Sequence, residues 1–489
     1  MYRFQMSQII MPDDFFLPFA GKLNKQNKWV QLAQLIPWSQ LEDKYADHFS
    51  KKKHGQIAYT VRMALGALII SQMRDLSDRE LVEEIPENIY YQYFLGLPGY
   101  QERAPFDASL MVHFRKRFPQ EVINEINELI AKSSTKSSGN DKDDNTPKPS
   151  SGEDINSKND VAQEHFGDLI LDATCVPADI HYPTDVHLLN HSREVLEDVL
   201  DTLHMPDIGV RSKPRDKREI ARIQYLDYSK KKKHGKTETR KTIKQQLQFI
   251  RRDICFIEVY AKAGRLPLLR KSQYRNLLVA NEIYRQQALM YQDQKHSVED
   301  RIVSLEQPHI RPIVRGKAGA HTEFGAKLEI SVVDGFVFSE RLDFNSFNEG
   351  IGLGQSLERY KERFGSYPAS VIADKIYRNR ANHLICKSLG IRISGPRLGR
   401  PPTDECEHRN QKHLERLDSK IRNIVEGRFG TGKRKYGLDR VYAKRPETTA
   451  TVIILNLLVL NLEHMLRVLY SLFSKFNIFR VYYVLSPTV

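Results

Sequence analysis

Two aspartates stand in or directly after apolar runs that have the character of strands. Asp172 lies within residues 166–176 (FGDLILDATCV), and Asp374 directly follows residues 369–373 (ASVIA). A carboxylate among apolar neighbours must be paired, protonated or bound to a metal ion, because burying an isolated charge is costly. Ligand sites in α/β sheets also gather at the carboxyl ends of strands. Taken alone, each aspartate could equally cap a helix or accept ordinary hydrogen bonds.

A third acid, Glu426, belongs to a predicted helix. We expect this helix to bury an apolar stripe formed by Leu414, Leu417, Ile421 and Ile424. Polar residues at offsets of three, four and seven positions would share one face of a continuous helix, namely Ser419, Arg422, Glu426 and Lys433. Gly430 and Gly432 are expected to break the helix before Lys433. Alone, Arg422 and Glu426 would be read as an ordinary surface ion pair.

The order of elements around these acids predicts an α/β layer with a mixed sheet. Strands are expected at 166–176, 324–333, 336–344, 369–373 and 391–394, and helices at 349–364 and 379–389. Asp334-Gly335 between the second and third strands is a favoured hairpin turn. A long interruption at about 184–305 reads as helical and carries basic clusters, such as Lys230 to Lys233, that are plausible contacts for a DNA backbone.

The N-terminal residues read as several short helices ending in a basic one at 108–118. Arg115, Lys116 and Arg117 on that last helix would contact DNA phosphates if the arrangement is of the helix-turn-helix kind. The alternative is a small helical bundle with a solvated basic face. Residues 133–160 are rich in Ser, Asp, Lys, Asn, Gly and Pro, and this composition predicts a disordered linker.

The bulk composition suits a protein with a polyanionic partner. Lys and Arg total 75 against 61 Asp and Glu, giving a net charge of +14. The four cysteines form no C-x-x-C pair, and residues 1–19 do not read as a signal peptide, so a cytosolic protein with reduced thiols is expected. The apolar run 448–462 is shorter than the roughly 20 residues that a membrane span needs, and we expect a core helix there.

The acids and their surroundings resemble the DDE transposases of bacterial insertion sequences. More narrowly, they resemble the group with a Tyr-Arg-Glu-Lys signature, because Arg422, Glu426 and Lys433 reproduce its last three members at the group's spacing; Ser419 stands at the Tyr position. Further stretches that carry the resemblance are 172–174 (DAT), 182–185 (YPTD), 311–317 (RPIVRGK) and 425–430 (VEGRFG), together with the N-terminal helical region.

The resemblance implies a ribonuclease-H-like catalytic core with a long helical insertion, preceded by a helical DNA-binding domain. It implies that Asp172, Asp374 and Glu426 are the catalytic metal ligands. Two Mg²⁺ ions, for which Mn²⁺ can substitute, would activate the attacking oxygen and stabilise the departing one, with Asp172 bridging both ions. Arg422 and Lys433 would neutralise DNA phosphates near the site.

The expected domains are 1–132 (helical, DNA-binding), 133–160 (linker), 161–445 (catalytic core with its insertion) and 446–489 (apolar helices packing on the core). The protein is expected to bind terminal inverted repeats in double-stranded DNA, to cleave the strands and to join them to target DNA. It would act as a homodimer on DNA. It is expected in the bacterial cytoplasm, associated with the nucleoid and not with a membrane. The alternatives are an inactive or domesticated DNA-binding relative and another ribonuclease-H-like nuclease. A zinc site at His181, Asp185, His187 and His191 is disfavoured, because its spacing matches no standard structural site.

Overall fold

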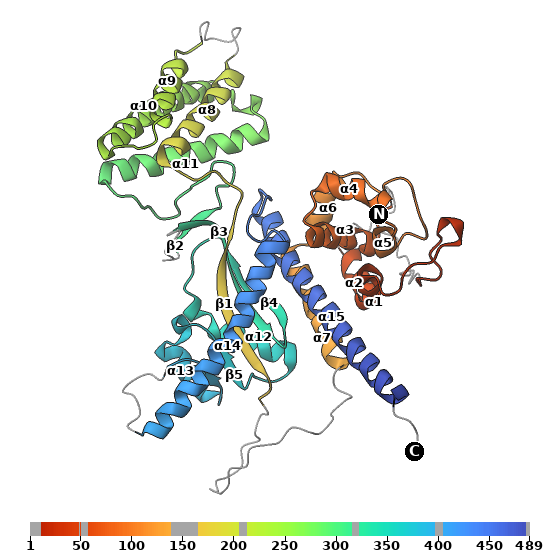
Figure 1. The fold of residues 1–489 in the computed structure, drawn as a ribbon. Coiled ribbons are helices and arrows are strands. Elements are labelled where there is room, and N and C mark those ends of the chain that lie inside the picture. Colours follow the sequence, from red (N-terminus) through yellow and green to blue (C-terminus); the bar gives the residue numbers. More distant parts are fainter. Residues whose placement is uncertain are drawn as a thin grey trace. The chain divides into compact units, whose positions relative to one another are not determined.

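The computed structural model of the chain describes residues 11–47, 49, 57–137, 165–204, 213–314, 322–396 and 404–485 (Figure 1). Two compact units are present. The first comprises Met1–Val176, Lys327–Leu342 and Phe347–Val489, and the second comprises Pro177–Ala326 and Asp343–Ser346. The second unit contains the predicted insertion at 184–305 and extends beyond it on both sides.

A mixed sheet forms the centre of the α/β region, as predicted. Its strands are β1 (Asp168–Pro177), β2 (Arg311–Val314), β3 (Thr322–Val333), β4 (Phe336–Asp343), β5 (Ser370–Ile372) and β6 (Arg392–Ile393). They follow the order β2-β3-β1-β5-β6, with β4 paired to β3. β5 lies parallel to both β1 and β6, whereas β2 and β3 are antiparallel.

The predicted hairpin turn between β3 and β4 is confirmed. Asp334 and Gly335 both have positive φ angles, of 48° and 82°. A turn with positive φ at both central residues matches the right-handed twist of the flanking strands. The turn also lies against α15 (Pro446–Leu485), because the His464 ring contacts the Asp334 carbonyl oxygen at 3.1 Å.

Helices flank the sheet residues that carry the acids. They are η3 (Glu349–Ile351), α12 (Leu353–Phe364), η4 (Lys375–Tyr377), α13 (Arg380–Ser388) and α14 (Glu405–Lys435). α15 is one continuous helix where several were expected. Its segment Pro446–Ser471 is long and apolar enough to cross a membrane, but 67% of the most apolar window is buried inside the protein. This burial agrees with the predicted core helix.

Two predictions for α14 are wrong. The helix does not end at Gly430 or Gly432 but continues to Lys435. A Cβ at Gly432 would lie 3.1 Å from Asn456 Oδ1 and 3.2 Å from Leu438 Cδ2, so glycine permits a close approach to α15, and this packing offsets the roughly 1 kcal/mol helical cost of glycine.

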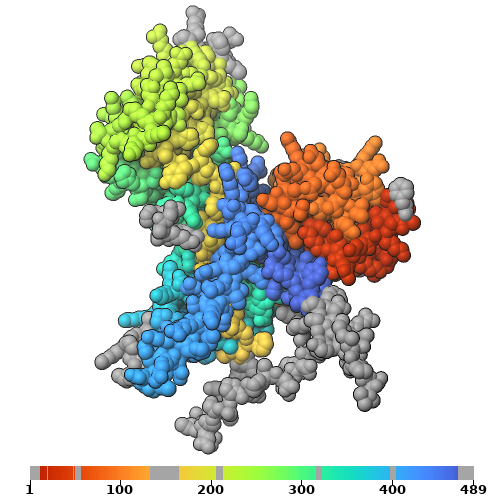
Figure 2. Space-filling view, viewed as in Figure 1, coloured from red at the N-terminus to blue at the C-terminus, as the bar shows by residue number. Residues whose placement is uncertain are grey.

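The expected apolar stripe of α14 is not its buried face. Leu414, Leu417 and Ile424 are 42–45% exposed, and Figure 2 shows α14, in blue, open to solvent on the face viewed. The buried residues of this helix are instead Asp418, Val425, Phe429 and Gly432. Helical spacing identified a possible stripe, but only the neighbours decide which stripe is covered.

The N-terminal region is helical, as predicted. Its elements are η1 (Pro18–Ala20), α1 (Lys28–Leu35), α2 (Trp38–Ala46), α3 (Val61–Arg74), α4 (Asp78–Glu87), α5 (Ile89–Phe94), α6 (Leu110–Arg117) and α7 (Gln120–Ser137). α4 begins with a capping box between Ser77 and Glu80. Asp107 lies just before α6, which begins at Leu110, and accepts a hydrogen bond from the Ser109 N–H.

The predicted boundaries at 132 and 133 do not agree with the structure. α7 runs through residue 133 to Ser137, and residues 138–160 of the predicted linker lie outside the described residues. α7 is also joined to the α/β region, because Asn127 donates to the Val337 carbonyl oxygen and accepts from Asn461 of α15. Residues 1–132 therefore share one compact unit with the sheet.

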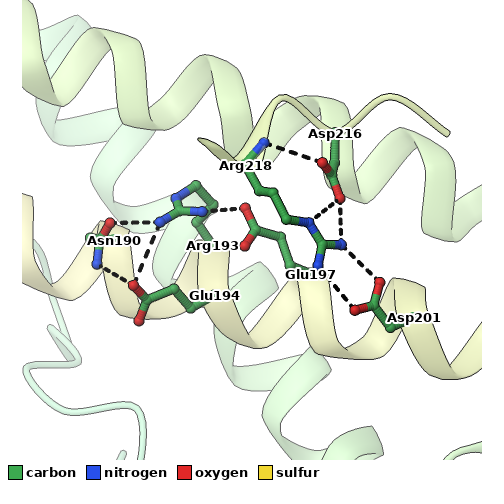
Figure 3. A network of polar contacts seen from close by, with 7 residues as sticks. All are labelled: Asn190, Arg193, Glu194, Glu197, Asp201, Asp216 and Arg218. Carbon is green, nitrogen blue, oxygen red and sulfur yellow. Dashed lines mark hydrogen bonds and ion pairs between the residues drawn. The ribbon is translucent and has the colours of Figure 1, made fainter. Parts of the chain in front are cut away.

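The second unit is a helical bundle. Its elements are α8 (Asp185–Leu203), α9 (Arg218–Ser229), α10 (Lys236–Lys262), η2 (Leu266–Leu268) and α11 (Lys271–Asp293). Buried apolar residues of α8, α10 and α11 form its core. Beside this core, α8 carries a polar network with Asp216 and Arg218 (Figure 3). The run Lys230–Lys233 lies exposed in the turn that precedes α10.

Candidate active site

Asp172 lies on the central strand β1, at its one partly exposed position between residues 169 and 176. Its Oδ1 accepts a hydrogen bond of 2.8 Å from the Ala173 N–H. Burial, with a smaller contribution from the negative charges of Glu349 and Asp374, raises the pKa of Asp172 to about 6, against the opposing effects of the Ala173 N–H and Arg422. A half-buried carboxylate near other acids favours a nearby cation.

Asp374 lies beside Asp172 at the same edge of the sheet. The parallel register pairs Asp168 with Ser370 and Ile170 with Ile372, so Asp172 and Asp374 each lie two residues beyond the last pair of the two strands. Asp374 caps the short helix η4 by accepting a 2.7 Å hydrogen bond from the Lys375 N–H. Its side chain is 53% exposed, so a ligand from solvent can reach it.

Glu426 is brought to this edge by α14. Arg422, one turn earlier, forms a 2.9 Å ion pair with Asp374 and lies 3.6 Å from Glu426 Oε1. A second pair fixes the helix to the sheet: Arg392 of β6 donates to both oxygens of the buried Asp418, at 2.7 and 3.0 Å. The guanidinium of Arg422 therefore lies between an acid of the sheet and an acid of the helix.

Two of the three predicted acids contact one arginine. Asp374 and Glu426 contact Arg422 directly, and Asp172 interacts electrostatically with both Arg422 and Asp374. Within the described ranges, no three His, Cys, Asp or Glu side chains are close enough together to hold one metal ion.

Lys433 lies near the C-terminal end of β1. Its Nζ donates to Thr174 Oγ1 at 3.1 Å and to the Cys175 carbonyl oxygen at 2.9 Å. The unbroken α14 makes this contact possible, since a helix ending before Lys433 would not fix its position. Ser419, at the Tyr position of the signature, is exposed on the same helix.

Sequence reasoning missed a second group of ionisable residues beside Asp172. Lys327 of β3 forms a 2.8 Å ion pair with Glu349, the residue whose charge acts on Asp172. Two residues along β3, the buried Glu329 accepts a 2.5 Å hydrogen bond from the Tyr377 hydroxyl, and burial raises the pKa of Glu329. Charged residues at alternating positions of an otherwise apolar strand were the available signal.

The basic residues of α6 differ in their surroundings. Arg115 forms a two-point ion pair with Asp78 of α4, and Arg117 donates to the Tyr45 hydroxyl at 3.2 Å. Lys116 is exposed between them. The first two side chains therefore join helices to each other, whereas Lys116 points to solvent.

The disfavoured zinc ligands are a contact cluster in the second unit. The rings of His181 and His187 lie 5.8 Å apart, and His187 Nδ1 lies 2.9 Å from the Tyr225 hydroxyl. Asp185 pairs with Arg301 at 2.6 Å.

Two parts of the chain match known transposase families. Residues 371–463, which include Asp374, Arg422, Glu426 and Lys433, match the family described as "Transposase DDE domain". Residues 18–117, which include α1 to α6, match the family described as "Transposase domain (DUF772)". The chain is also 28% identical over 174 residues to "Uncharacterized protein ORF8 in nfe locus" of Rhizobium meliloti, covering 36% of this chain and 73% of that protein. No solved structure matches.

Both family matches, one at each end of the sequence, define a protein of the transposase class. The match at residues 371–463 narrows this class to transposases with a DDE domain, and it contains Asp374 and Glu426. Together the two matches support a DDE transposase of an insertion sequence.

Proposed function

We propose that this transposase binds the terminal inverted repeats of an insertion sequence, cleaves the DNA strands there and joins the resulting 3′-hydroxyl to target DNA. The observation that carries the proposal is the meeting of Asp172, Asp374 and Arg422 with Glu426 at one edge of the sheet. A nucleic-acid phosphate approaching this edge would meet carboxylates able to hold cations and an arginine able to bind its oxygens.

The donor set fits divalent metal ions. Asp374 and Glu426 pair with Arg422, and burial together with neighbouring negative charge raises the pKa of Asp172. We infer that Asp172, Asp374 and Glu426 would hold Mg²⁺ or Mn²⁺. Bound ions would supply activation of the attacking oxygen and stabilisation of the leaving one. In this proposal Arg422 holds the acids together before metal binding and then turns toward a DNA phosphate.

The strand order supports a ribonuclease-H-like core for the proposed enzyme. The hairpin partner β4 pairs with β3, and β1, β5 and β6 follow in the sheet with β5 parallel to both neighbours. Asp172 lies on β1, Asp374 follows β5 and Glu426 lies on α14, and we infer that these are the three acids of such a core. The same resemblance places the chain in the Tyr-Arg-Glu-Lys group, with Ser419 in the first position.

The surrounding residues have proposed roles in holding DNA. Lys433, held against β1 by Thr174 and Cys175, would place its charge beside the acids and neutralise a strand passing there. Lys116, with Arg115 and Arg117 beside it, would contact the transposon end through α6. Pairing of two ends implies a homodimer on DNA, and action on chromosomal DNA implies a cytoplasmic protein associated with the nucleoid.

A supercoiled plasmid carrying the element's two ends tests the proposal. The purified chain is incubated with it in Mg²⁺, in Mn²⁺ and in EDTA, and the products are separated on a gel. Joined products that require a divalent metal ion are expected. Nicks without joining would indicate another nuclease, and a mobility shift without cleavage would indicate an inactive DNA-binding relative. Either result would contradict the proposed function.

A further inference from the structure

A groove of about 730 Å³ lies within the first unit, away from the three acids. Residues of α3, α4 and α6 line one side, and residues 437 and 440–445, which lie between α14 and α15, line the other together with residues of α15. The joining segment is held in place by its backbone: Thr449 Oγ1 donates to the Ala443 carbonyl oxygen at 2.8 Å, and Thr448 Oγ1 to the Arg445 carbonyl oxygen at 3.1 Å.

Exposure alternates along residues 440–444 (RVYAK) of this segment, and Arg445, which follows, is also exposed. Arg440, Tyr442 and Lys444 are exposed, whereas Val441 between them is only 2% exposed. Side chains two residues apart in an extended chain point to the same side. A tyrosine therefore lies between two cationic side chains on the solvent side, and the Arg440 guanidinium carbon lies 5.6 Å from the centre of the Tyr442 ring.

The ring of this tyrosine is largely exposed to solvent. Tyr442 is 67% exposed, although the adjoining groove has an apolar floor that includes Leu68, Val452 and Leu455. An exposed aromatic ring between cations is the arrangement that binds unpaired nucleotides, since the ring stacks on a base and the cations contact the flanking phosphates.

The charges that line the groove favour an anion. The cationic side chains are Arg115, Lys116, Arg440, Lys444 and Arg445, and the acids are Asp75, Asp78 and Glu80. Asp78 and Arg115 neutralise each other as an ion pair. Five cationic side chains against three acids give the lining a net positive charge.

We propose that residues Arg440–Arg445, together with Lys116 of α6, bind an unpaired stretch of DNA strand, with Tyr442 stacked on one base. This inference rests on the proposed function, because it assigns the DNA contact of the same enzyme. The N-terminal region and the segment after α14 form this surface together, so neither family-matched region would complete it alone.

The test measures DNA binding by the full chain in EDTA, where cleavage is prevented. The probes are a fluorescein-labelled oligothymidylate of about 12 nucleotides and a duplex of about 20 base pairs with arbitrary sequence. Tyr442→Ala is expected to weaken binding of the single strand about tenfold and to leave duplex binding within about twofold. Tyr442→Phe is expected to retain binding, and Tyr274→Ala, at an exposed tyrosine of α11, is the matched control.

The charges are tested by salt dependence. Lys444→Gln and Arg445→Gln are each expected to reduce the slope of log affinity against log salt by about 0.7 for the single strand. Lys262→Gln, at an exposed position at the end of α10, should leave the slope unchanged. Equal loss on both probes for Tyr442→Ala, or an unchanged salt slope for Lys444→Gln and Arg445→Gln, overturns the inference.

These outcomes separate the inference from the proposed function. If the parent chain joins plasmid ends while the groove variants bind the single strand normally, only the groove assignment fails. If the parent chain binds neither probe and leaves the plasmid intact, the proposed function itself fails.

Discussion

The two units each contain a cluster of arginine and carboxylate groups, but the balance of charge differs. In the second unit, α8 and its neighbours bring three cations to four acids, namely Arg193, Lys213 and Arg218 with Glu194, Glu197, Asp201 and Asp216. In the first unit, one cation serves three acids, namely Arg422 with Asp172, Asp374 and Glu426. The cluster in the second unit is nearly neutral, whereas the cluster in the first unit leaves negative charge uncompensated.

The cluster in the second unit is also more deeply buried than the cluster in the first unit. The side chains of Arg193 and Glu197 are only 2% and 10% exposed, whereas those of Asp374 and Glu426 are 53% and 57% exposed. A buried and balanced network holds helices together, and an exposed surplus of carboxylates is available to a metal ion. The comparison teaches that arginine–carboxylate contacts alone do not identify a functional site; the net charge and access to solvent do.

The largest expected effect is a loss of DNA cleavage without a loss of stability, on substitution of an acid at the candidate site. Asp172→Asn is expected to reduce DNA cleavage by about three orders of magnitude, because a carboxylate that would hold the metal ions is lost. The free energy of unfolding should be unchanged or higher, because a half-buried charge is removed. Asp168→Asn, at the exposed start of the same strand, is the control for cleavage on the plasmid gel. Near-normal cleavage by Asp172→Asn would remove Asp172 from the site.

In the arginine–carboxylate network of the second unit, we expect substitutions to reduce the stability of the protein. Arg193→Met leaves the buried Glu197 without its ion pair and should lower the free energy of unfolding by about 3–5 kcal/mol. Arg285→Met breaks the exposed pair with Glu282 and should leave the free energy of unfolding nearly unchanged. Urea unfolding followed by circular dichroism measures both. Adding Glu197→Leu to Arg193→Met should recover most of the loss, and a persistent loss would contradict the charge argument.

The stability of the second unit should depend on pH through its buried residue Asp253. Burial and the charges of Glu197 and Asp216 raise the pKa of Asp253 from 3.8 to about 8. Folding therefore favours the protonated form, so the contribution to stability is full below pH 3.8 and is lost as the pH rises toward 8. Asp253→Asn should reduce the fall in melting temperature between these values, whereas Asp227→Asn at an exposed position should not. Equal slopes for Asp253→Asn and the parent chain would show that Asp253 is not the titrating group.

The smallest effect concerns how α14 is held in place. Gly432→Ala should destabilise the first unit by about 1–3 kcal/mol, because the new Cβ meets Asn456 and Leu438. Gly427→Ala, on the same helix with no atom within 4 Å of its Cβ, should instead stabilise by about 0.5–1 kcal/mol. Thermal unfolding of the pair tests whether packing overrides helix propensity. A gain in stability for both variants would mean that α14 and α15 do not pack closely at Gly432.

Local chemistry in the sequence determined much of this protein. The Asp334-Gly335 turn, the strand after which Asp374 stands and the helix carrying Arg422 and Glu426 all follow from short-range patterns, because turn geometry and periodicity depend on neighbouring residues. The spacing of Arg422, Glu426 and Lys433 and the family resemblance also needed no coordinates.

Only the tertiary structure decided which patterns are used. α14 passes through Gly432 because α15 packs there, its apolar residues Leu414 and Leu417 stay exposed because nothing described covers them, and Arg422 reaches Asp374 across 48 positions of sequence. Glu349 acts on Asp172 from a separate element, and α6 meets the segment after α14 to line a groove. Such contacts depend on the packing of distant elements, which local sequence patterns do not encode.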